Sequence, residues 1–285
     1  MRYATRQDFI NAPDKRVAFI GMSGLGKTYI SQALRDTGDW FHYSVDYRIG
    51  TRYMGEPIVD NFKREAMRVP FLREMLLSDS IYIGSNITFE NLSPLSTYLG
   101  KPGNPDKGGI SFDEYMRRQT IHRDAEIAAT LDALPFIDKS RCIYGYGNFV
   151  CDTSGSICEV VDPANPDDPV LKALSENMLI VWIRGADSHI DTLVARFNKA
   201  PKPMYARPDA MISRWNAYLD SHDLQEAEVD PDAFIRWSYR KILDDRLPMY
   251  AAIAGNWGVS VDADALATAG DADAIVDVVA AALPA

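Results

Sequence analysis

The chain has 285 residues, of which 47% are hydrophobic and 25% charged, and it carries a net charge of −10 at pH 7. This composition is typical of a globular protein with a buried core, and no run of Lys and Arg offsets the acidic excess, so nucleic acid and anionic membrane surfaces are not expected partners. Residues 1–15 do not resemble a signal peptide and no later stretch has the apolar length of a membrane span, so we expect a cytoplasmic location.

The first predicted strand, residues 17–20, is followed by a glycine-rich turn and then by a pattern typical of a helix. The turn matches GxxxxGK(S/T) at Gly21, Gly26, Lys27 and Thr28. Such a loop wraps its N–H groups around phosphates, its lysine contacts the β- and γ-phosphates, and its hydroxyl ligates Mg²⁺. The alternative is a glycine-rich turn that binds nothing. We predict a site for a nucleoside triphosphate and Mg²⁺ with nucleotide contacts from Gly21, Met22, Ser23, Gly24, Leu25, Gly26, Lys27 and Thr28.

The residues that follow the P-loop helix predict in turn a strand, a helix and a long loop. Alternating apolar residues predict a second strand that ends at Asp46, and a helix is expected over residues 58–77 with a break or kink at Pro70. Residues 84–111 are rich in Gly, Pro, Ser and Asn and are expected to form a long loop or an irregular insert.

Strands and helices alternate in the rest of the chain. A helix is expected over residues 111–134, a strand over residues 142–152 that ends at Asp152, and a central strand in the apolar run 178–185. Further helices are expected at 187–198, 209–221 and 231–254, followed by a last strand and helix. This order predicts a three-layer α/β fold in a single domain over 1–285: a parallel sheet with helices on both faces and the site at the carboxyl ends of the strands.

Isolated polar residues carry less information than the P-loop. Asp152 stands where a carboxylate would hold Mg²⁺ together with Thr28, and a plain strand-end Asp is the alternative. The cysteines Cys142, Cys151 and Cys158 form no CxxC motif and are expected to be buried free thiols, and the four histidines are assigned no chemistry.

The P-loop is compatible with a switch, a motor or a phosphotransferase. A GTPase would require an NKxD motif, and the nearest text, NKAP at 198–201, lacks the Asp. A motor would require an acidic pair after the strand that ends at Asp152, and Thr153 follows instead. Both alternatives are therefore weakened, and a phosphotransferase remains. Such an enzyme needs a carboxylate for the acceptor, cations for the transferred phosphate and a lid against water.

Further stretches form a common pattern. SVDYRI at 44–49 matches a DxDxxI motif with Ser44 in place of the first Asp, HRDAE at 122–126 matches FRxxE, and CDTSGSICE at 151–159 matches a glycine-rich loop of which Gly155 is kept. Together with the P-loop these stretches resemble P-loop small-molecule kinases of the shikimate kinase family, which have the nucleoside monophosphate kinase-like fold. Two later segments agree with this resemblance: residues 199–208 are similar to a lid that ends in an Arg-Pro pair, and RLPMY at 246–250 is similar to a segment with an acceptor-binding arginine.

The resemblance implies a P-loop NTPase fold of the kinase type, and an ATP-dependent enzyme that moves the γ-phosphoryl group to a hydroxyl of a small acceptor. Relative to that fold, residues 59–116 are an insertion that would either cover the acceptor or bind a protein partner. Asp46 would orient the acceptor hydroxyl and accept its proton. The altered acceptor motifs argue against shikimate itself. The implied catalytic residues are Lys27, Asp46, Arg123 and Arg207, and the implied acceptor contacts are Asp46, Arg123, Gly155 and Arg246.

Each of these residues also has an ordinary structural interpretation. Asp46 would cap a turn, Arg123 would pair with Glu126 on a helix, and Arg207 and Arg246 would lie on solvated surfaces. The chain as a whole has an alternative function too. It would be a nucleotide-binding regulatory ATPase whose insertion, residues 59–116, contacts a protein partner.

Overall fold

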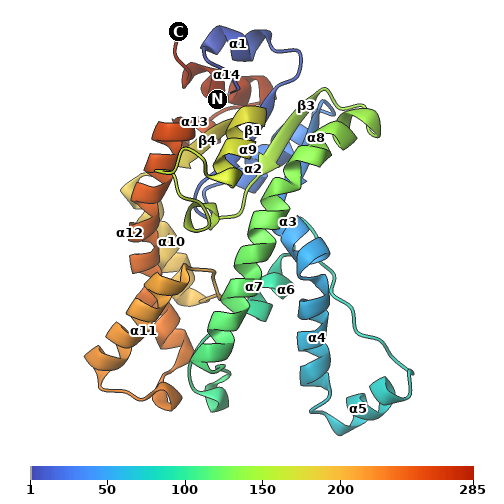
Figure 1. The fold of residues 1–285 in the computed structure, drawn as a ribbon, viewed down its shortest axis with the longest axis vertical. Coiled ribbons are helices and arrows are strands. Elements are labelled where there is room, and N and C mark those ends of the chain that lie inside the picture. Colours follow the sequence, from blue (N-terminus) through green and yellow to red (C-terminus); the bar gives the residue numbers. More distant parts are fainter. Residues whose placement is uncertain (1) are drawn as a thin grey trace. The chain divides into compact units, whose positions relative to one another are not determined.

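The computed structural model describes residues 2–285, which divide into two compact units. The first unit consists of residues 2–45, 126–201 and 236–285, and the second of residues 46–125 and 202–235 (Figure 1). The segment predicted as an insertion, 59–116, lies inside the second unit. The segment predicted as a lid, 199–208, contains the boundary between the units.

The first unit is built around a parallel sheet. Its described residues form five strands in the order β2-β3-β1-β4-β5, and every pairing is parallel. The strands are β1 (Arg16–Ile20), β2 (Trp40–Ser44), β3 (Asn148–Asp152), β4 (Leu179–Arg184) and β5 (Gly258–Asp262). The central strands are buried along almost their whole length, because helices cover both faces of the sheet. The predicted α/β class with a parallel sheet is confirmed.

The helices of the first unit pack on this sheet and on one another. Helix α8 lies against β2, β3 and α9, and α2 lies against β2, β3 and α14 (Figure 1). The helices are α1 (Arg6–Asn11), α2 (Lys27–Arg35), α8 (Ala133–Cys142), α9 (Pro169–Asn177), α10 (Asp187–Lys199), α13 (Ala263–Ala267), α14 (Ala272–Ala281) and most of α12 (Pro231–Trp257). Helix α9 was not predicted. Its start is set by Asp168, whose carboxylate accepts hydrogen bonds from the N–H groups of Val170 and Leu171.

Two predicted strand boundaries are wrong. β2 ends at Ser44, and the chain turns into the short helix α3 (Val45–Arg48), so Asp46 lies in a helical first turn. A carboxylate is favourable there because it complements the N–H groups of that turn. β3 begins only at Asn148, because α8 continues to Cys142 and a turn with Gly145 at φ 75° follows.

The second unit is helical. Its elements are α3, a π-helical turn (Ile49–Tyr53), α4 (Gly55–Ala66), α5 (Pro70–Leu77), α6 (Ser93–Leu99), the first part of α7 (Phe112–Leu131), α11 (Pro208–His222) and the start of α12. The predicted break at Pro70 is present, and Pro70 is the first residue of α5. Helix α6 forms inside the segment that was expected to be an irregular loop.

A buried guanidinium ties three helices of the second unit together. Arg118 of α7 donates to the Tyr98 carbonyl of α6, to Oδ1 of Asn61 of α4 at 3.1 Å and to Oε1 of Glu114 at 2.8 Å. These contacts compensate the burial of the Arg118 charge, because its donors meet a carboxylate and polar oxygens.

Part of the predicted lid is also anchored on α7. The Gln119 amide donates to the Met204 carbonyl at 3.4 Å and accepts from the Ala206 N–H at 3.1 Å, and Tyr205 stacks on His122. The role of this segment as a lid stays a prediction.

Two expectations from composition concern the whole chain. Within residues 2–285, no helix combines the length and the apolarity that crossing a membrane requires. Cys151 and Cys158 are buried, as expected, but Cys142 is exposed because it ends α8 at the surface. The expectation of a buried thiol at Cys142 is therefore wrong.

Candidate functional site

The glycine-rich loop joins β1 to α2 and has the backbone that its sequence predicts. Gly21, directly after β1, has φ 144°, and a Cβ placed on it would lie 2.9 Å from the Ile183 carbonyl oxygen. No other residue type combines this conformation with that approach to β4. The chain therefore leaves the sheet at the position where glycine is required.

The start of α2 faces the inside of this loop. Gly26 is the residue that precedes the helix, and no side chain caps its first turn. The N–H groups of a first helical turn have no partner within the helix, and together with the helix dipole they attract an anion. The loop therefore fits a phosphate group.

Lys27 is the cation of this loop. Its side chain is largely buried, and Nζ donates to the carbonyl oxygen of Gly21 at 2.7 Å and to that of Met22 at 3.2 Å. These hydrogen bonds hold the ammonium group on the inner side of the glycine-rich loop, where it would contact the phosphates.

Thr28 and Asp152 meet beneath the loop. Thr28 Oγ1 donates to Asp152 Oδ2 at 2.6 Å, and Asp152 is only 4% exposed. The parallel pairing of β1 with β3 places Asp152 opposite Phe19, and the Thr153 hydroxyl fixes the strand end by donating to the Phe19 carbonyl. One hydroxyl and one carboxylate suit Mg²⁺, which prefers oxygen and keeps waters and substrate phosphates as its other ligands.

The wider set of donors agrees with this interpretation. Among residues 2–285 no three His, Cys, Asp or Glu side chains gather as a metal cage. A magnesium ion shared with a nucleotide needs fewer protein ligands than such a cage, and the pair Thr28 and Asp152 would supply them.

His42 is a neighbour of this pair that sequence reasoning missed. Its Nε2 lies 3.8 Å from Asp152 Oδ2, and the side chain is buried. In the β2–β3 pairing His42 stands opposite Val150, and Ser44 opposite Asp152, so His42 and Asp152 are diagonal neighbours on one face. The alternation along the predicted second strand places His42 on one face of the sheet. Its proximity to Asp152 follows only once β2 is known to pair with β3.

The loop that follows β3 lies directly against the P-loop. A Cβ on Gly155 would meet Ser23 Oγ and lie 2.9 Å from the Ser23 amide nitrogen, so only glycine allows this approach. The Gly155 carbonyl accepts from Arg246 Nη1 at 2.9 Å and from the Tyr250 hydroxyl at 2.9 Å. Arg246 also pairs with the buried Glu159. Gly155 and Arg246, both predicted acceptor contacts, are thus in contact with each other in the first unit.

Burial dominates the electrostatics of this second loop. Burial alone would lower the pKa of Arg246, but the Glu159 carboxylate together with the neighbouring Cys158 and Tyr250 more than compensates, so the pKa is raised and the guanidinium stays charged. Burial raises the pKa of the Cys158 thiol to about 12 and that of the Tyr250 hydroxyl well above its ordinary value. Both groups therefore remain neutral hydrogen-bonding or packing groups at physiological pH.

The remaining predicted site residues belong to the second unit. Asp46 is half-buried in α3. The Arg123 side chain of α7 is 45% exposed, and its Nη1 lies 3.4 Å from Asp124 Oδ1. Arg207 directly precedes α11, and its Nε lies 3.8 Å from Asp209 Oδ1. Their roles toward an acceptor stay predictions.

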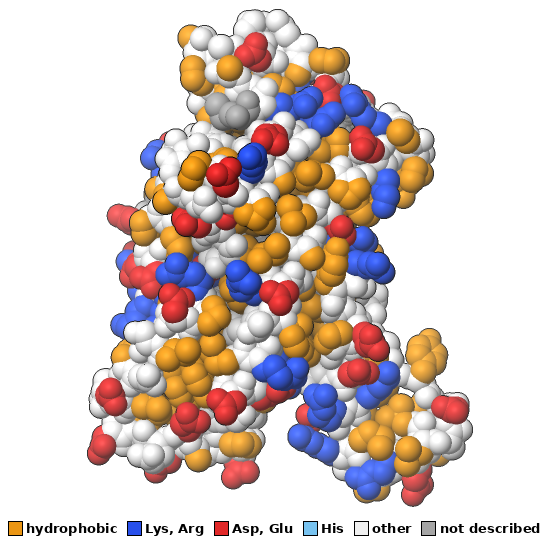
Figure 2. Space-filling view, viewed as in Figure 1, with side chains coloured by type: hydrophobic (Ala, Val, Ile, Leu, Met, Phe, Trp, Pro, Cys, Tyr) orange, Lys and Arg blue, Asp and Glu red, His pale blue; other side chains and the backbone are white. Residues whose placement is uncertain are grey.

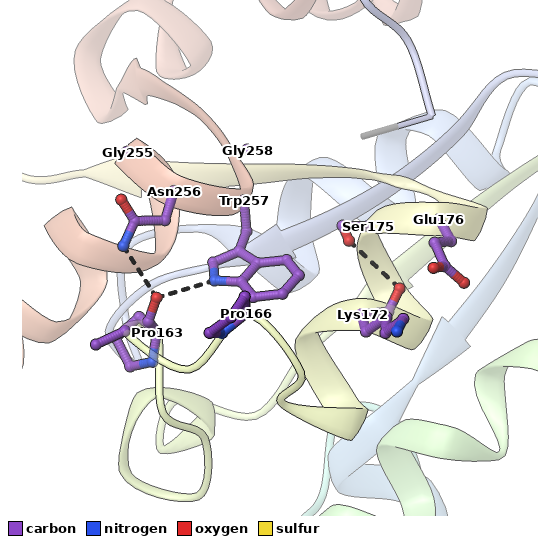
Figure 3. A pocket seen from close by; sticks show the side chains of 10 residues that line it. Pro163, Pro166, Lys172, Ser175, Glu176, Gly255, Asn256, Trp257 and Gly258 are labelled. Carbon is purple, nitrogen blue, oxygen red and sulfur yellow. Dashed lines mark hydrogen bonds between the residues drawn. The ribbon is translucent and has the colours of Figure 1, made fainter.

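The first unit also contains a cavity of about 530 Å³ between α9 and the junction of α12 with β5 (Figure 3). The Pro163 carbonyl accepts from Trp257 Nε1 at 3.1 Å and from Asn256 Nδ2 at 2.9 Å at its side. Since α9 precedes β4 and Trp257 precedes β5, this cavity lies at the amino ends of these strands, whereas the P-loop lies at the carboxyl end of β1.

Comparisons with known proteins give a structural likeness but no match in sequence. No protein-family model matches the chain, and no curated protein matches its sequence. Among solved structures, this one resembles a crystal structure of shikimate kinase from Bacteroides thetaiotaomicron. The alignment covers 92% of this chain and 94% of that chain, with 14% identity and a TM-score of 0.38. A likeness at this level does not identify an activity.

Proposed function

We propose that this protein is a Mg²⁺- and ATP-dependent phosphotransferase that moves the γ-phosphoryl group to a hydroxyl of a small molecule. The observation that carries the proposal is the hydrogen bond of Thr28 to the buried Asp152, below a loop that holds the Lys27 ammonium group on its inner side. Oxygen ligands for a metal and a cation for phosphate therefore stand at one helix N-terminus.

The P-loop residues and Asp152 of the first unit each have a defined task in this reaction. The loop N–H groups and Lys27 bind the β- and γ-phosphates, and Thr28 and Asp152 hold the metal ion. When bound, Mg²⁺ neutralises phosphate charge and orients the phosphate oxygens. Phosphoryl transfer depends mostly on such positioning and charge stabilisation, so no covalent step on the protein is needed.

The second unit supplies the candidates for the acceptor side. Asp46 accepts the proton of the acceptor hydroxyl. The hydroxyl oxygen of the acceptor bonds to the γ-phosphorus while the bond between the γ-phosphorus and the β,γ-bridging oxygen breaks. Arg123 and Arg207 contribute positive charge to the acceptor and to the transferred group. We also propose Gly155 and Arg246 as acceptor contacts, because the family resemblance implies them. In this structure Arg246 forms an ion pair with Glu159.

A regulatory ATPase with a protein partner is the second candidate. The specific observation that favours it is α5, which buries none of its residues. Phe71 and Leu77 on this helix are 67% and 72% exposed, and Tyr82 beyond it is 93% exposed. Figure 2 shows hydrophobic side chains gathered at the lower right, where Figure 1 labels α5. Exposed apolar patches of this kind often mark protein interaction sites.

Acceptor-dependent ATP consumption distinguishes the two candidates. The purified protein is assayed with Mg²⁺ and ATP against sugars, polyols, cyclic hydroxy acids, nucleosides and nucleoside monophosphates, with a blank that lacks acceptor. We expect one class to raise turnover by orders of magnitude over the blank. Slow hydrolysis that no small molecule accelerates would instead favour the regulatory ATPase.

Two carboxylate variants separate the acceptor side from the metal side. We expect Asp46→Asn to bind MgATP almost normally but to stop transfer, because only the proton acceptor is lost. Asp152→Asn should raise the Mg²⁺ concentration needed for half-maximal ATP binding by about tenfold or more, since a metal-oriented carboxylate becomes neutral. Equal loss of nucleotide affinity in Asp46→Asn would place Asp46 in the metal site instead.

A further inference from the structure

Three arginines meet at one carboxylate in the first unit. Asp14 Oδ2 lies 2.9 Å from Arg2 Nη2, 2.6 Å from Arg16 Nη2 and 3.1 Å from Arg141 Nη2. Arg2 belongs to the segment before α1, Arg16 is the first residue of β1, and Arg141 lies in the last turn of α8. The fold therefore creates a basic cluster that no run of basic residues in the sequence indicates.

The cluster has more positive charge than its carboxylate can balance. Three guanidinium groups and one carboxylate sum to about +2, in a chain whose net charge is −10. Within residues 2–285 no second carboxylate pairs with any of these arginines. The side chains of Asp14, Arg16 and Arg2 are only 11%, 13% and 24% exposed, so water screens their repulsion weakly. An additional anion would relieve this repulsion.

The guanidinium groups also retain hydrogen-bonding capacity. Arg2 Nε donates to the Tyr3 hydroxyl at 3.0 Å. For Arg16 and Arg141 the ion pair with Asp14 is the one guanidinium interaction in the part of the chain that the structure describes. The Arg141 side chain is 46% exposed and makes the cluster accessible from solvent. Figure 2 shows Lys and Arg side chains gathered near the upper end of this face.

This cluster lies far from the P-loop. Arg16 begins β1 and Gly21 directly follows its last residue, so the two places are separated by the length of the strand. A strand of this length spans about 17 Å. An anion at the cluster would therefore be distinct from a nucleotide phosphate at Lys27.

We propose that Arg2, Arg16 and Arg141 form a second anion site, which binds the phosphate group of a small molecule. A phosphate dianion matches the charge excess, and guanidinium groups pair with phosphate oxygens through two parallel N–H bonds. A nucleic acid is disfavoured because its other phosphates would meet the acidic remainder of the protein. The proposal does not depend on the phosphotransferase activity.

Calorimetric titration with inorganic phosphate and with phenyl phosphate tests the site. We expect Arg141→Ala to weaken binding by about tenfold, because one charge-assisted contact is lost. Arg240→Ala is the matched control, since Arg240 is 53% exposed and paired with Asp191 and Asp244 in the same unit. Its affinity should equal that of the wild type. Preference for phenyl phosphate identifies an organic phosphate as the ligand type, and equal affinity identifies free phosphate.

Asp14→Asn gives the opposite and more diagnostic prediction. It removes the one negative charge of the cluster, so phosphate should bind about tenfold more tightly than to the wild type and should raise the melting temperature more. A merely structural ion cluster would be destabilised by this change without gaining affinity for phosphate. Unchanged affinity in both Arg141→Ala and Asp14→Asn would overturn the proposal. Titrations with and without saturating MgATP show whether the P-loop contributes.

Discussion

The ammonium group of Lys27 is held by two carbonyl groups of its own loop. The oxygens of Gly21 and Met22 accept its hydrogen bonds, so the charge is oriented toward the inside of the loop. Orientation of this kind lowers the cost of binding a phosphate, because little of the site has to reorganise.

We therefore expect Lys27→Met to lower turnover by about a hundredfold or more while the fold remains. Lys27 is only 6% exposed, so methionine, which retains most of the apolar stem, is a better variant than alanine. Lys172→Met, on a lysine whose side chain is 51% exposed, is the control. Full turnover in Lys27→Met would overturn the proposed function, provided that circular dichroism shows an unchanged fold.

The three thiols should differ strongly in reactivity. The thiolate is the reactive form, and burial raises the pKa of Cys158 to about 12 and that of Cys151 further, whereas Cys142 is exposed. A chromogenic disulfide reagent at pH 8 should therefore label one thiol rapidly in the folded protein. Cys142→Ser should abolish this fast phase. A fast phase that persists in Cys142→Ser would mean that a buried thiol is accessible.

At the scale of elements, the P-loop is supported by the loop that follows β3. Gly155 contacts Ser23 from one side, and α12 holds the Gly155 carbonyl through Arg246 and Tyr250. The position of Ser23 thus depends on an element more than 130 residues away in the sequence. A substitution at this contact should therefore weaken nucleotide binding more than it destabilises the core.

We expect Gly155→Ala to weaken nucleotide binding by about tenfold or more, because the added methyl group cannot fit beside Ser23. Gly147→Ala is the matched control, since a Cβ there meets nothing within 4 Å and the residue precedes the same strand. The measurement is the dissociation constant of a fluorescent ATP analogue. Equal affinity in the two variants would mean that the loop adapts without affecting the P-loop.

At the scale of the whole molecule, the proposed reaction divides its residues between two units. The proposed nucleotide contacts and metal ligands belong to the first unit, and the proposed acceptor residues Asp46, Arg123 and Arg207 belong to the second. Since the proposed nucleotide site lies within the first unit, MgATP should bind without an acceptor.

This binding should stabilise the folded chain. At a ligand concentration of about 100 times Kd, linkage predicts a gain of roughly 2.7 kcal/mol in the free energy of unfolding. Urea unfolding with increasing MgATP measures the gain, and Lys27→Met should show much less of it. No shift at any MgATP concentration would contradict nucleotide binding to the native state.

The sequence alone determined the features that arise locally. The P-loop is encoded by contiguous residues, because a glycine turn between a strand and a helix needs few distant contacts. The apolar run that forms β4 and the break at Pro70 are local in the same sense. The α/β class follows from the order of such elements. Roles in acceptor binding were assigned by resemblance and stay predictions.

Only the tertiary structure decided which distant residues meet. Whether His42 lies near Asp152 depends on β2 pairing with β3, and whether Gly155 supports Ser23 depends on the packing of two loops. The basic cluster around Asp14 combines three segments, so no local pattern indicates it. The physical reason is that strand order and side-chain burial result from the packing of the whole core, whereas turns and helix ends depend on a few adjacent residues.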